Sequence, residues 1–574
     1  MSGHGIGCCR YLSLALLVWA GVDAPAVRTC LAQDPATSGP EPSRRTGGPL
    51  EKRVGSPYVE LDSWIYPVLD RMAALGYMHF EFSDMRPWTR IECARMTQEA
   101  GKALDVDLSV PPEAQLLYEA LRKEFQRELD TLSGTQTGPS IRLESLYTGV
   151  TEISGLPLND SYHFGQTIIN NYGRPYQEGF NGYDGLSGYA VAGRFAIYMR
   201  GEFQHAPSAP AYPLSAREAI AAADLTPLEP ATPSASVDRF RLLDAYAAGN
   251  LAGWDLTIGK QSLWWAPNAG GALLFSDNAE PIDMVRVSRT APFELPWIFR
   301  WLGPMKWDLF AGKLAGNLYP PRPFIHGEKI GFKPTENLEL SFSRTGEFGG
   351  EGRALTLGAI IRTYTSFESS YEYPASQNPG ERNGGFDFSY RIPGVRNWLT
   401  VYGDALSRDD PSPLDAPRRA AMNLGLYVAR IPHVPQLDFR VEAVNTNTVS
   451  SPNRTGKFVY WENFYRDLYT NNNNLIGDWI GREGTGLQAW SRYWFNARNN
   501  IQFGYRHAVV AGQFIPYGET LNDASVSMNW WLHDQLQFSA LLQYERWFAP
   551  ILASSPRTNW TSSIEITFWP VVPH

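Results

Sequence analysis

The stretch WDLTIGKQSLWWAPNAGGALLFSDNAEPIDMVRVS, from Trp254 to Ser288, indicates the fold class of this chain of 574 residues. Its first residues alternate apolar with polar side chains, and successive side chains of a β-strand point to opposite faces. The apolar set is Trp254, Leu256 and Ile258. A Gly- and Asn-rich turn follows, and then a second run that ends in Met284-Val285-Arg286-Val287. An apolar face backed by an arginine-bearing face suits a wall between lipid and water, so the stretch predicts a transmembrane β-barrel.

The same alternation recurs from residue 141 to residue 569. Along Leu437–Ala443, for example, Asp438, Arg440 and Glu442 share one face of a single predicted strand. In a soluble β-sandwich such a face would point to solvent, whereas in a barrel it lines the lumen. Turn signals such as Pro393-Gly394 separate the runs. About 430 residues at roughly 24 per strand and connection predict on the order of 18 antiparallel strands.

The amino-acid composition further narrows the class of protein. Aromatic residues make up 13 % of the chain, with 19 Trp and 28 Tyr, which suits the interfacial girdles of a barrel or a surface that binds sugars. The formal net charge of −9 argues against nucleic acid as a partner, since binding to phosphates requires a basic surface. Beyond the leader, no run reaches the roughly 20 apolar residues that a membrane helix requires, so strands must make any crossing.

The N-terminal residues predict export. Residues 1–32 have the pattern of a cleaved signal peptide, with Arg10 before an apolar core at Leu12–Ala20 and small residues at Cys30-Leu31-Ala32. Cleavage there leaves Cys93 as the remaining cysteine, which excludes an internal disulfide and a cysteine metal site. Residues 33–55 are rich in Pro, Gly and charge and predict a flexible linker.

Residues 56–135 change to a helical period and predict a small periplasmic α-helical domain before a barrel over residues 140–574. A capping box at Thr89 and Glu92 should begin the second helix, because each side chain can satisfy the other residue's free amide. A third helix should follow Pro111-Pro112. The first predicted helix has one apolar face, formed by Ile65, Val68, Leu69, Met72 and Leu75.

The first two predicted helices also resemble a surface-layer-homology hairpin, through Asp62-Ser63-Trp64-x-Tyr66 and Arg86-Pro87-Trp88-Thr89-Arg90. That resemblance implies contact with peptidoglycan in the cell wall. The alternative, which we favour, is that Trp64, Tyr66 and Trp88 pack the helical bundle or dock it under the barrel.

The chain lacks the usual signatures of catalysis. It contains no phosphate loop, dinucleotide fingerprint, G-x-S-x-G elbow or H-E-x-x-H motif, and no two of its nine histidines are spaced i, i+4 to hold a metal. Asp409-Asp410 point to opposite sides if they lie in a strand, and we interpret them as a charged loop. The sequence therefore predicts no catalytic residues, no metal, no cofactor and no enzymatic activity.

Two long connections, residues 205–238 and 448–482, are candidates for partner contacts, since long barrel loops face outward. The second combines aromatic rings with planar polar groups, which together can bind sugars. The sequence does not decide which connection lies outside or whether either one fills the lumen. A purely structural role also stays open, in which the aromatic residues belong to the interfacial girdle and the asparagines form turns. The predicted polysaccharide-binding residues are Trp461, Tyr465, Arg466, Asp467, Asp478, Trp479 and Arg482, beside an asparagine run at 471–474.

Two segments carry a family resemblance. GKQSLWWAPNAGGALLFSDNAEP (Gly259–Pro281) and YRDLYTNNNNLIGDWIGREGTG (Tyr465–Gly486) resemble capsule-assembly outer-membrane proteins of the Wzi type. The resemblance implies an 18-strand barrel in the outer membrane, in contact with its lipid. It also implies a lectin-like protein that binds, anchors or organises capsular or extracellular polysaccharide at the cell surface. We expect Trp264-Trp265 to pack structurally near the barrel rim.

Three other functions stay open at this point. The first is a diffusion porin or sugar channel, which requires an open lumen. The second is a barrel that anchors the outer membrane to the wall through its helical domain. The third, a barrel enzyme acting on glycans or lipids, is disfavoured by the missing motifs.

Overall fold

The computed structural model describes residues 54–79, 81–135, 138–353, 355–366, 373–374, 377–395, 398–410 and 412–570. The predicted signal peptide at residues 1–32, and nearly all of the predicted linker, lie outside the described residues.

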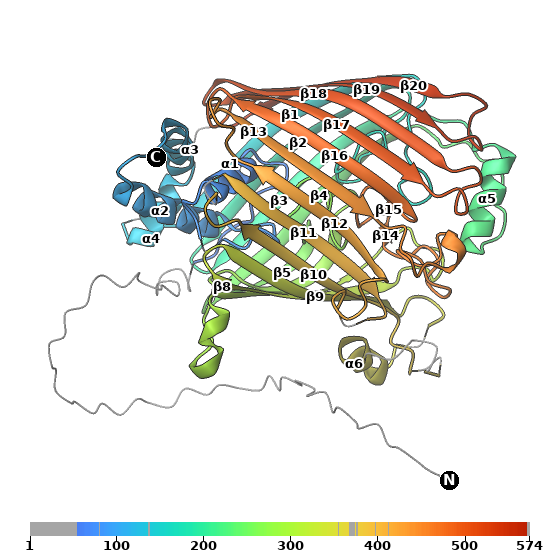
Figure 1. Cartoon of the computed structure of the whole chain (residues 1–574), viewed down its shortest axis with the longest axis horizontal. Helices are drawn as coiled ribbons and strands as arrows, with labels where there is room; N and C mark the ends of the chain where they lie inside the picture. Colours follow the sequence, from blue (N-terminus) through green and yellow to red (C-terminus); the bar gives the residue numbers. More distant parts are fainter. Residues whose placement is uncertain are drawn as a thin grey trace, which may run out of the picture. The chain divides into compact units, whose positions relative to one another are not determined.

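The described strands form a closed antiparallel β-barrel of 18 strands (Figure 1). The sheet closes where the first strand pairs with the last, from Leu146 opposite Phe568 to Ser154 opposite Trp560. This confirms the predicted fold class and strand number. The strands are β1 (Ser140–Ser154), β2 (Gly179–Ala192), β3 (Phe195–Ala206), β4 (Val237–Leu251), β5 (Trp254–Gln261), β6 (Ile282–Arg289), β7 (Met305–Lys313), β8 (Phe324–Thr335), β9 (Leu338–Phe348), β10 (Glu381–Arg391), β11 (Leu399–Arg408), β12 (Ala420–Val428), β13 (Leu437–Asn445), β16 (Gly484–Trp494), β17 (Asn500–Val510), β18 (Glu519–His533), β19 (Leu536–Phe548) and β20 (Arg557–Phe568).

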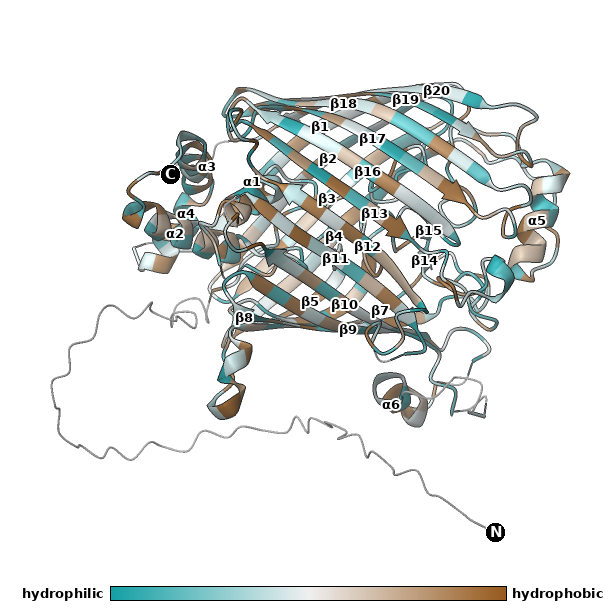
Figure 2. Ribbon diagram, viewed as in Figure 1, coloured by the Kyte–Doolittle hydropathy of each residue, from teal (hydrophilic) through white to brown (hydrophobic). Residues whose placement is uncertain are grey.

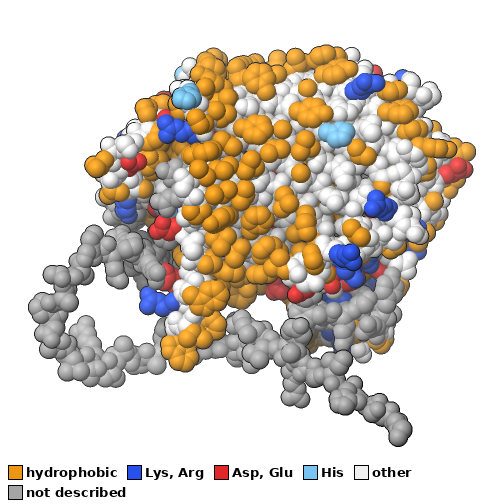
Figure 3. Space-filling view, viewed as in Figure 1, with side chains coloured by type: hydrophobic (Ala, Val, Ile, Leu, Met, Phe, Trp, Pro, Cys, Tyr) orange, Lys and Arg blue, Asp and Glu red, His pale blue; other side chains and the backbone are white. Residues whose placement is uncertain are grey.

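The strands have the two faces that the sequence predicts. In β5, Leu256 and Ile258 face outward and are 55 % and 61 % exposed, whereas Asp255 and Thr257 are buried inside the barrel. Arg286 points inward as well, and its Nη2 lies 2.7 Å from Oδ2 of Asp308 on the next strand. Apolar and polar residues alternate along the ribbons in Figure 2, and the outer wall in Figure 3 carries many apolar side chains and few charged ones. The wall is therefore suited to lipid outside and to paired charges inside.

The two ends of the barrel differ in their connections. At one end most turns are short, such as residues 193–194, 252–253 and 534–535. The connections at the other end are longer, and in outer-membrane barrels the long loops face outward while the short turns face the periplasm. We call this second end the loop end. Its connections are residues 155–178, 207–236, 262–281, 314–323, 349–380, 409–419, 446–483, 511–518 and 549–556, which include both long connections singled out in the sequence.

The N-terminal helices α1 to α4 lie at the short-turn end, so we call it the helix end (Figure 1). The capping box is present: the Oγ1 of Thr89 accepts from the backbone N–H of Glu92 at 3.2 Å, and Glu92 accepts from the backbone N–H of Thr89 at 2.8 Å. Among the described residues, no helix combines the length and apolarity needed to cross a bilayer. The helices are α1 (Ile65–Ala74), α2 (Arg90–Val106), α3 (Pro112–Glu124) and α4 (Gln126–Ser133).

Buried ion pairs join this helical region to the barrel wall. Lys329 of β8 lies between two carboxylates, with its Nζ 3.2 Å from Asp84 Oδ2 and 2.8 Å from Asp387 Oδ2. Lys306 of β7 contacts Glu92 of α2 at 2.7 Å. The helix end of the lumen is therefore occupied by the chain's own N-terminal region.

The aromatic residues of the surface-layer-homology resemblance pack within this junction. Tyr66 and Trp88 are buried with their ring centroids 5.1 Å apart, and Trp64 lies against Trp531 at 6.4 Å. Their packing matches the alternative that we favoured. Contact of the helical region with peptidoglycan stays a prediction, as do the domain boundaries.

The connection at residues 262–281 folds back into the lumen from the loop end, and we call it the inward loop. The backbone N–H groups of Ala269 and Gly270 donate to Glu442 at 2.8 and 3.0 Å, and that of Leu273 donates to Asp404 at 2.7 Å. Glycine permits this approach, because a Cβ at Gly270 would overlap the side chain of Gln488. Trp264 and Trp265 thus have the predicted structural role, but they lie inside the lumen and not at the rim.

Candidate functional site

The predicted site residues come from the connection between β13 and β16, residues 446–483, which also holds the short strands β14 (Thr470–Asn471) and β15 (Asn474–Leu475). The structure divides them into two groups. Trp461, Asp478, Trp479 and Arg482 are at most 6 % exposed and point into the packed interior of the loop end. Tyr465, Arg466 and Asp467 lie together at another part of the loop, beside residues from two neighbouring connections.

The first group holds connections in place. Asp478 accepts hydrogen bonds from Asn423 Nδ2 and from the backbone N–H of Ile480, both at 3.0 Å. The ring of Trp479 lies under the guanidinium of Arg506, 5.2 Å from ring centroid to carbon Cζ. The backbone carbonyl of Trp461 accepts from Arg408 at 3.0 Å. Asp478 and Trp479 are engaged within the protein through their side chains, and Trp461 is buried and held through its backbone. Sugar binding at these residues stays a prediction, and their visible role is structural.

Arg482 belongs to a charged cluster that ties three connections together. It donates to Asp224 Oδ1 at 2.5 Å and to the carbonyl of Gly456 at 2.8 Å. His163 lies between two carboxylates, with Nδ1 2.9 Å from Asp160 Oδ2 and Nε2 2.7 Å from Asp224 Oδ2. Asp224 ends helix α5 (Leu214–Asp224), so the cluster joins α5 to residues 155–178 and to residues 446–483.

The cluster fixes the charge of the histidine. Burial alone lowers the pKa of His163, but the carboxylates of Asp160 and Asp224 outweigh burial and raise the pKa from 6.5 to about 10. Burial likewise raises the pKa of Asp224, and the positive charges of His163 and Arg482 outweigh it and lower that pKa to about 2. A charged histidine between two carboxylates therefore stabilises the closed loops at neutral pH.

We expect the loop end to loosen in alkali. A histidine whose pKa rises on folding stabilises the fold fully below its unfolded pKa of 6.5, and that contribution is lost as the pH rises through about 10. The contribution of Asp224 is present above 3.8 and is lost only as the pH falls through about 2. Hydrogen exchange of residues 155–178 and 214–224 should therefore accelerate from pH 6.5 to pH 10, after correction for intrinsic rates. In H163Q this pH dependence should disappear, and an equal dependence in both proteins would contradict the assignment.

The second group belongs to a surface formed by three connections, which we call the loop-end patch: Tyr319, Arg353, Phe464, Arg466 and Asp467. The guanidinium of Arg353 lies 4.7 Å from the ring centroid of Phe464, and that of Arg466 lies 5.6 Å from the ring of Tyr319. Asp467 accepts from the backbone N–H of Tyr319 at 3.3 Å, and so holds one connection against another. All five side chains are partly exposed, whereas neighbouring Tyr465 is 5 % exposed and donates its hydroxyl to the carbonyl of Gly349.

The patch combines the groups that recognise acidic sugars. Guanidinium groups form two parallel hydrogen bonds with a carboxylate, and aromatic rings offer flat apolar faces. Of the patch residues, the sequence predicted Arg466 and Asp467 as site residues, but not Phe464, Tyr319 or Arg353. Tyr319 and Arg353 come from other connections, and no local motif marks them.

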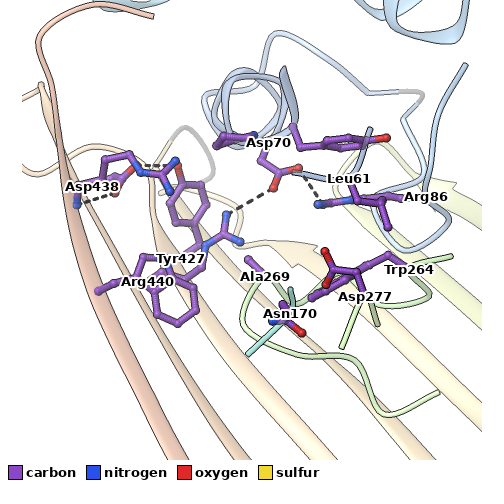
Figure 4. A pocket seen from close by; sticks show the side chains of 14 residues that line it. Leu61, Asp70, Arg86, Asn170, Trp264, Ala269, Asp277, Tyr427, Asp438 and Arg440 are labelled. Carbon is purple, nitrogen blue, oxygen red and sulfur yellow. Dashed lines mark hydrogen bonds and ion pairs between the residues drawn. The ribbon is translucent and has the colours of Figure 1, made fainter. Parts of the chain in front are cut away.

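A chamber lies in the lumen between α1 and the inward loop (Figure 4). Its volume is about 200 Å³, and charged pairs line it: Arg86 Nη2 lies 2.9 Å from Asp70 Oδ1, and Arg440 Nη2 lies 3.7 Å from Asp70 Oδ2. Asp438 on the same wall accepts from the indole N–H of Trp494 at 2.7 Å. The chamber is thus bounded by the helical region on one side and by the inward loop on the other.

In the part of the chain that the structure describes, His, Cys, Asp and Glu side chains form no group of three that could hold a metal ion. The absence of a cofactor and of catalysis stays a prediction.

Comparison with known proteins shows which family the chain belongs to. The family model for the capsule assembly protein Wzi matches residues 150–561, which is most of the barrel. An uncharacterised 55.8 kDa protein of the cps region of Klebsiella pneumoniae is 28 % identical over 176 residues, which are 30 % of this chain. That match spans about a third of the relative's own length, 34 %.

Among solved structures, Wzi of Escherichia coli aligns with a TM-score of 0.65 at 17 % identity, over 90 % of this chain and all of that chain. It is an outer-membrane protein involved in group 1 capsule assembly and a carbohydrate-binding β-barrel. OprD of Pseudomonas aeruginosa aligns with a TM-score of 0.38 at 8 % identity, over 76 % of this chain and 96 % of that one, and is too distant to inform function. The chain is thus a member of the capsule assembly protein Wzi family, built as an outer-membrane β-barrel.

Proposed function

We propose that this protein is a surface lectin, which binds capsular or extracellular polysaccharide through the loop-end patch and retains or organises it at the cell surface. The observation that carries the proposal is the patch itself: two guanidinium groups lie beside two aromatic rings, on connections that face outward. Membership of the Wzi family supports it. So does the E. coli structure of the same fold, whose protein binds carbohydrate.

The proposed division of labour follows from burial. Arg353, Phe464 and Arg466 contact the polymer directly, by stacking and by charge-assisted hydrogen bonds to acidic sugars. The guanidinium groups also donate to backbone carbonyls, Arg353 to Phe464 and Arg466 to Asn463 and Leu225, and offer their other N–H groups to the polymer. Asp467 and Tyr465 hold the patch together through their bonds to residues 319 and 349. The remaining predicted site residues are buried, do not contact the polymer and fix the loops that carry the patch. They are Trp461, Asp478, Trp479 and Arg482. No covalent bond is made or broken in this role.

The lumen argues against a diffusion porin or sugar channel. The helical region enters it from one end and the inward loop from the other, and charged side chains join both to the wall. A porin needs a continuous aqueous path, and these segments lie within the lumen where such a path would run. A wall-anchoring role through the helical region is compatible with the lectin and stays a separate prediction.

The test compares variants of the full-length protein in lipid nanodiscs with surface polysaccharide purified from the source strain. Each hydrogen bond to a charged group is expected to contribute about 1.5–3 kcal/mol. We therefore expect R353A/F464A/R466A to lose at least about tenfold in affinity. Isothermal titration or surface plasmon resonance would measure the loss.

The matched control is R194A/F195A, which removes an exposed Arg from the turn between β2 and β3 and the exposed Phe that begins β3, both at the helix end. This control should bind like the wild type. Unchanged affinity in a folded patch variant, with heat-modifiable gel migration intact, would place the polymer site elsewhere. Equal losses of affinity in the patch variant and in the control would show that the loss is not specific to the patch.

A further inference from the structure

The connection between β6 and β7 carries an unusually exposed apolar segment at the helix end. It contains the short 3₁₀ helix η2 (Trp297–Leu302), and we call residues 296–302, Pro-Trp-Ile-Phe-Arg-Trp-Leu, the aromatic foot. None of the η2 residues is buried. Trp297, Ile298, Phe299 and Trp301 are 84 %, 66 %, 43 % and 67 % exposed.

The foot is held firmly at its base. Phe293 and Met305 exchange backbone hydrogen bonds of 3.0 and 2.8 Å, and the backbone N–H of Lys333 donates to the carbonyl of Pro304 at 3.0 Å. Gly303 has a φ of 71°, and a Cβ there would overlap the carbonyl of Lys333, so only glycine suits this position. A well-anchored segment that presents large apolar side chains to the outside marks a surface that contacts something apolar.

Its position indicates what it contacts. The foot projects from the barrel wall beside β8 and away from the lumen (Figure 1), and in Figure 3 an apolar projection continues from the orange outer wall at this end. The strands next to its base carry outward-facing aromatic rings at the same level. Trp254 and Trp307 lie 6.1 Å apart, edge to face, and Arg289 covers the ring of Trp254 at 5.2 Å. The foot therefore continues the lipid-facing surface of the barrel sideways.

We propose that the aromatic foot inserts into the periplasmic leaflet of the outer membrane and binds its phospholipids. Trp297 and Trp301 lie where indole rings are favoured, between the acyl chains and the headgroups. Ile298 and Phe299 reach the acyl chains, and Arg300 pairs with lipid phosphate. The foot gives the barrel a lateral attachment that limits its tilt in the bilayer. This proposal rests on the outer-membrane location and is independent of polysaccharide binding.

The test places a bimane label on I298C in the mature protein, which lacks the three leader cysteines, reconstituted in vesicles of phosphatidylethanolamine and phosphatidylglycerol. Vesicles that contain lipids brominated at different depths report insertion, and iodide reports exposure to water. We expect bimane emission to shift to the blue, to fall with lipids brominated near the headgroup end of the chain, and to resist iodide. The native Cys93 is buried and is not expected to take the label.

The matched control is L108C, at a position in the helical region that is fully exposed and at the same end of the barrel. Its label should be quenched by iodide and insensitive to brominated lipid. The same behaviour at residue 298 would overturn the proposal. Protection of residue 298 from both quenchers would overturn it as well, because a second copy of the chain or another protein would then cover the foot. Heat-modifiable migration of both variants checks that each barrel is folded.

Discussion

Replacing Lys329 by Met should lower the free energy of unfolding by about 3–5 kcal/mol. Lys329 is fully buried, and its ammonium group lies between Asp84 of the helical region and Asp387 of β10. Methionine has a similar length and fills the same space, so the loss is mainly of charge. Two buried carboxylates would remain close to each other without a cation, which is the costly case for buried ions. Urea titration of the purified protein in detergent micelles, followed by heat-modifiable migration, measures the change.

The control for this prediction is K123M. Lys123 also joins the helical region to the barrel, through Asp534 at 2.5 Å, but both side chains of that pair are 63 % exposed. An exposed ion pair contributes only about 0–1 kcal/mol, so this variant should unfold almost like the wild type. If the two variants unfold alike, the buried junction does not hold the helical region in the barrel.

The second large effect concerns the closure of the lumen. Glu442 and Asp404 project from the wall and accept three backbone N–H groups of the inward loop, those of Ala269, Gly270 and Leu273. The double variant E442A/D404A leaves these buried donors without partners, at about 1–3 kcal/mol each. We expect the inward loop to leave its place in the lumen for a measurable fraction of the time. Planar bilayer recordings should then show discrete current steps for the variant and a quiet baseline for the wild type.

A suitable comparison is E152A/D283A, which removes one glutamate and one aspartate from outward faces of strands and should stay as quiet as the wild type. Stable open channels in the wild-type protein would contradict the closed lumen and would favour the porin. A double variant that stays silent while its barrel is folded would show that these carboxylates are not what holds the inward loop.

The sequence predicted what local periodicity determines. Alternation along β5 and β6 placed Asp255 and Arg286 inside and Leu256 outside, and the structure confirms each position. Thr89 and Glu92 begin α2 because a capping box depends on residues three apart and on little else. The strand number followed from the length of the barrel segment divided by a mean of roughly 24 residues per strand and connection.

The lumen and the surface site depend instead on contacts between segments far apart in the chain. Trp479 and Asp478 have the composition of an exposed loop, yet they are buried because the inward loop and β12 pack against them. Arg353 joins the loop-end patch although it precedes Phe464 by 111 residues. Neither outcome has a local signature. Gly270 and Gly271 hinted that another segment packs closely against this backbone, because glycine allows such an approach. A turn explains the two glycines equally well.

Retention of polysaccharide can be measured as the division of surface polysaccharide between cells and medium. The measurement compares the source strain, a deletion strain and the deletion strain complemented with the wild type or with R353A/F464A/R466A. If the protein retains the polymer, deletion should leave the total amount unchanged and shift it into the medium. The wild-type gene should restore retention, and the patch variant should not. An unchanged division between cells and medium in the deletion strain would contradict a role in retaining polysaccharide.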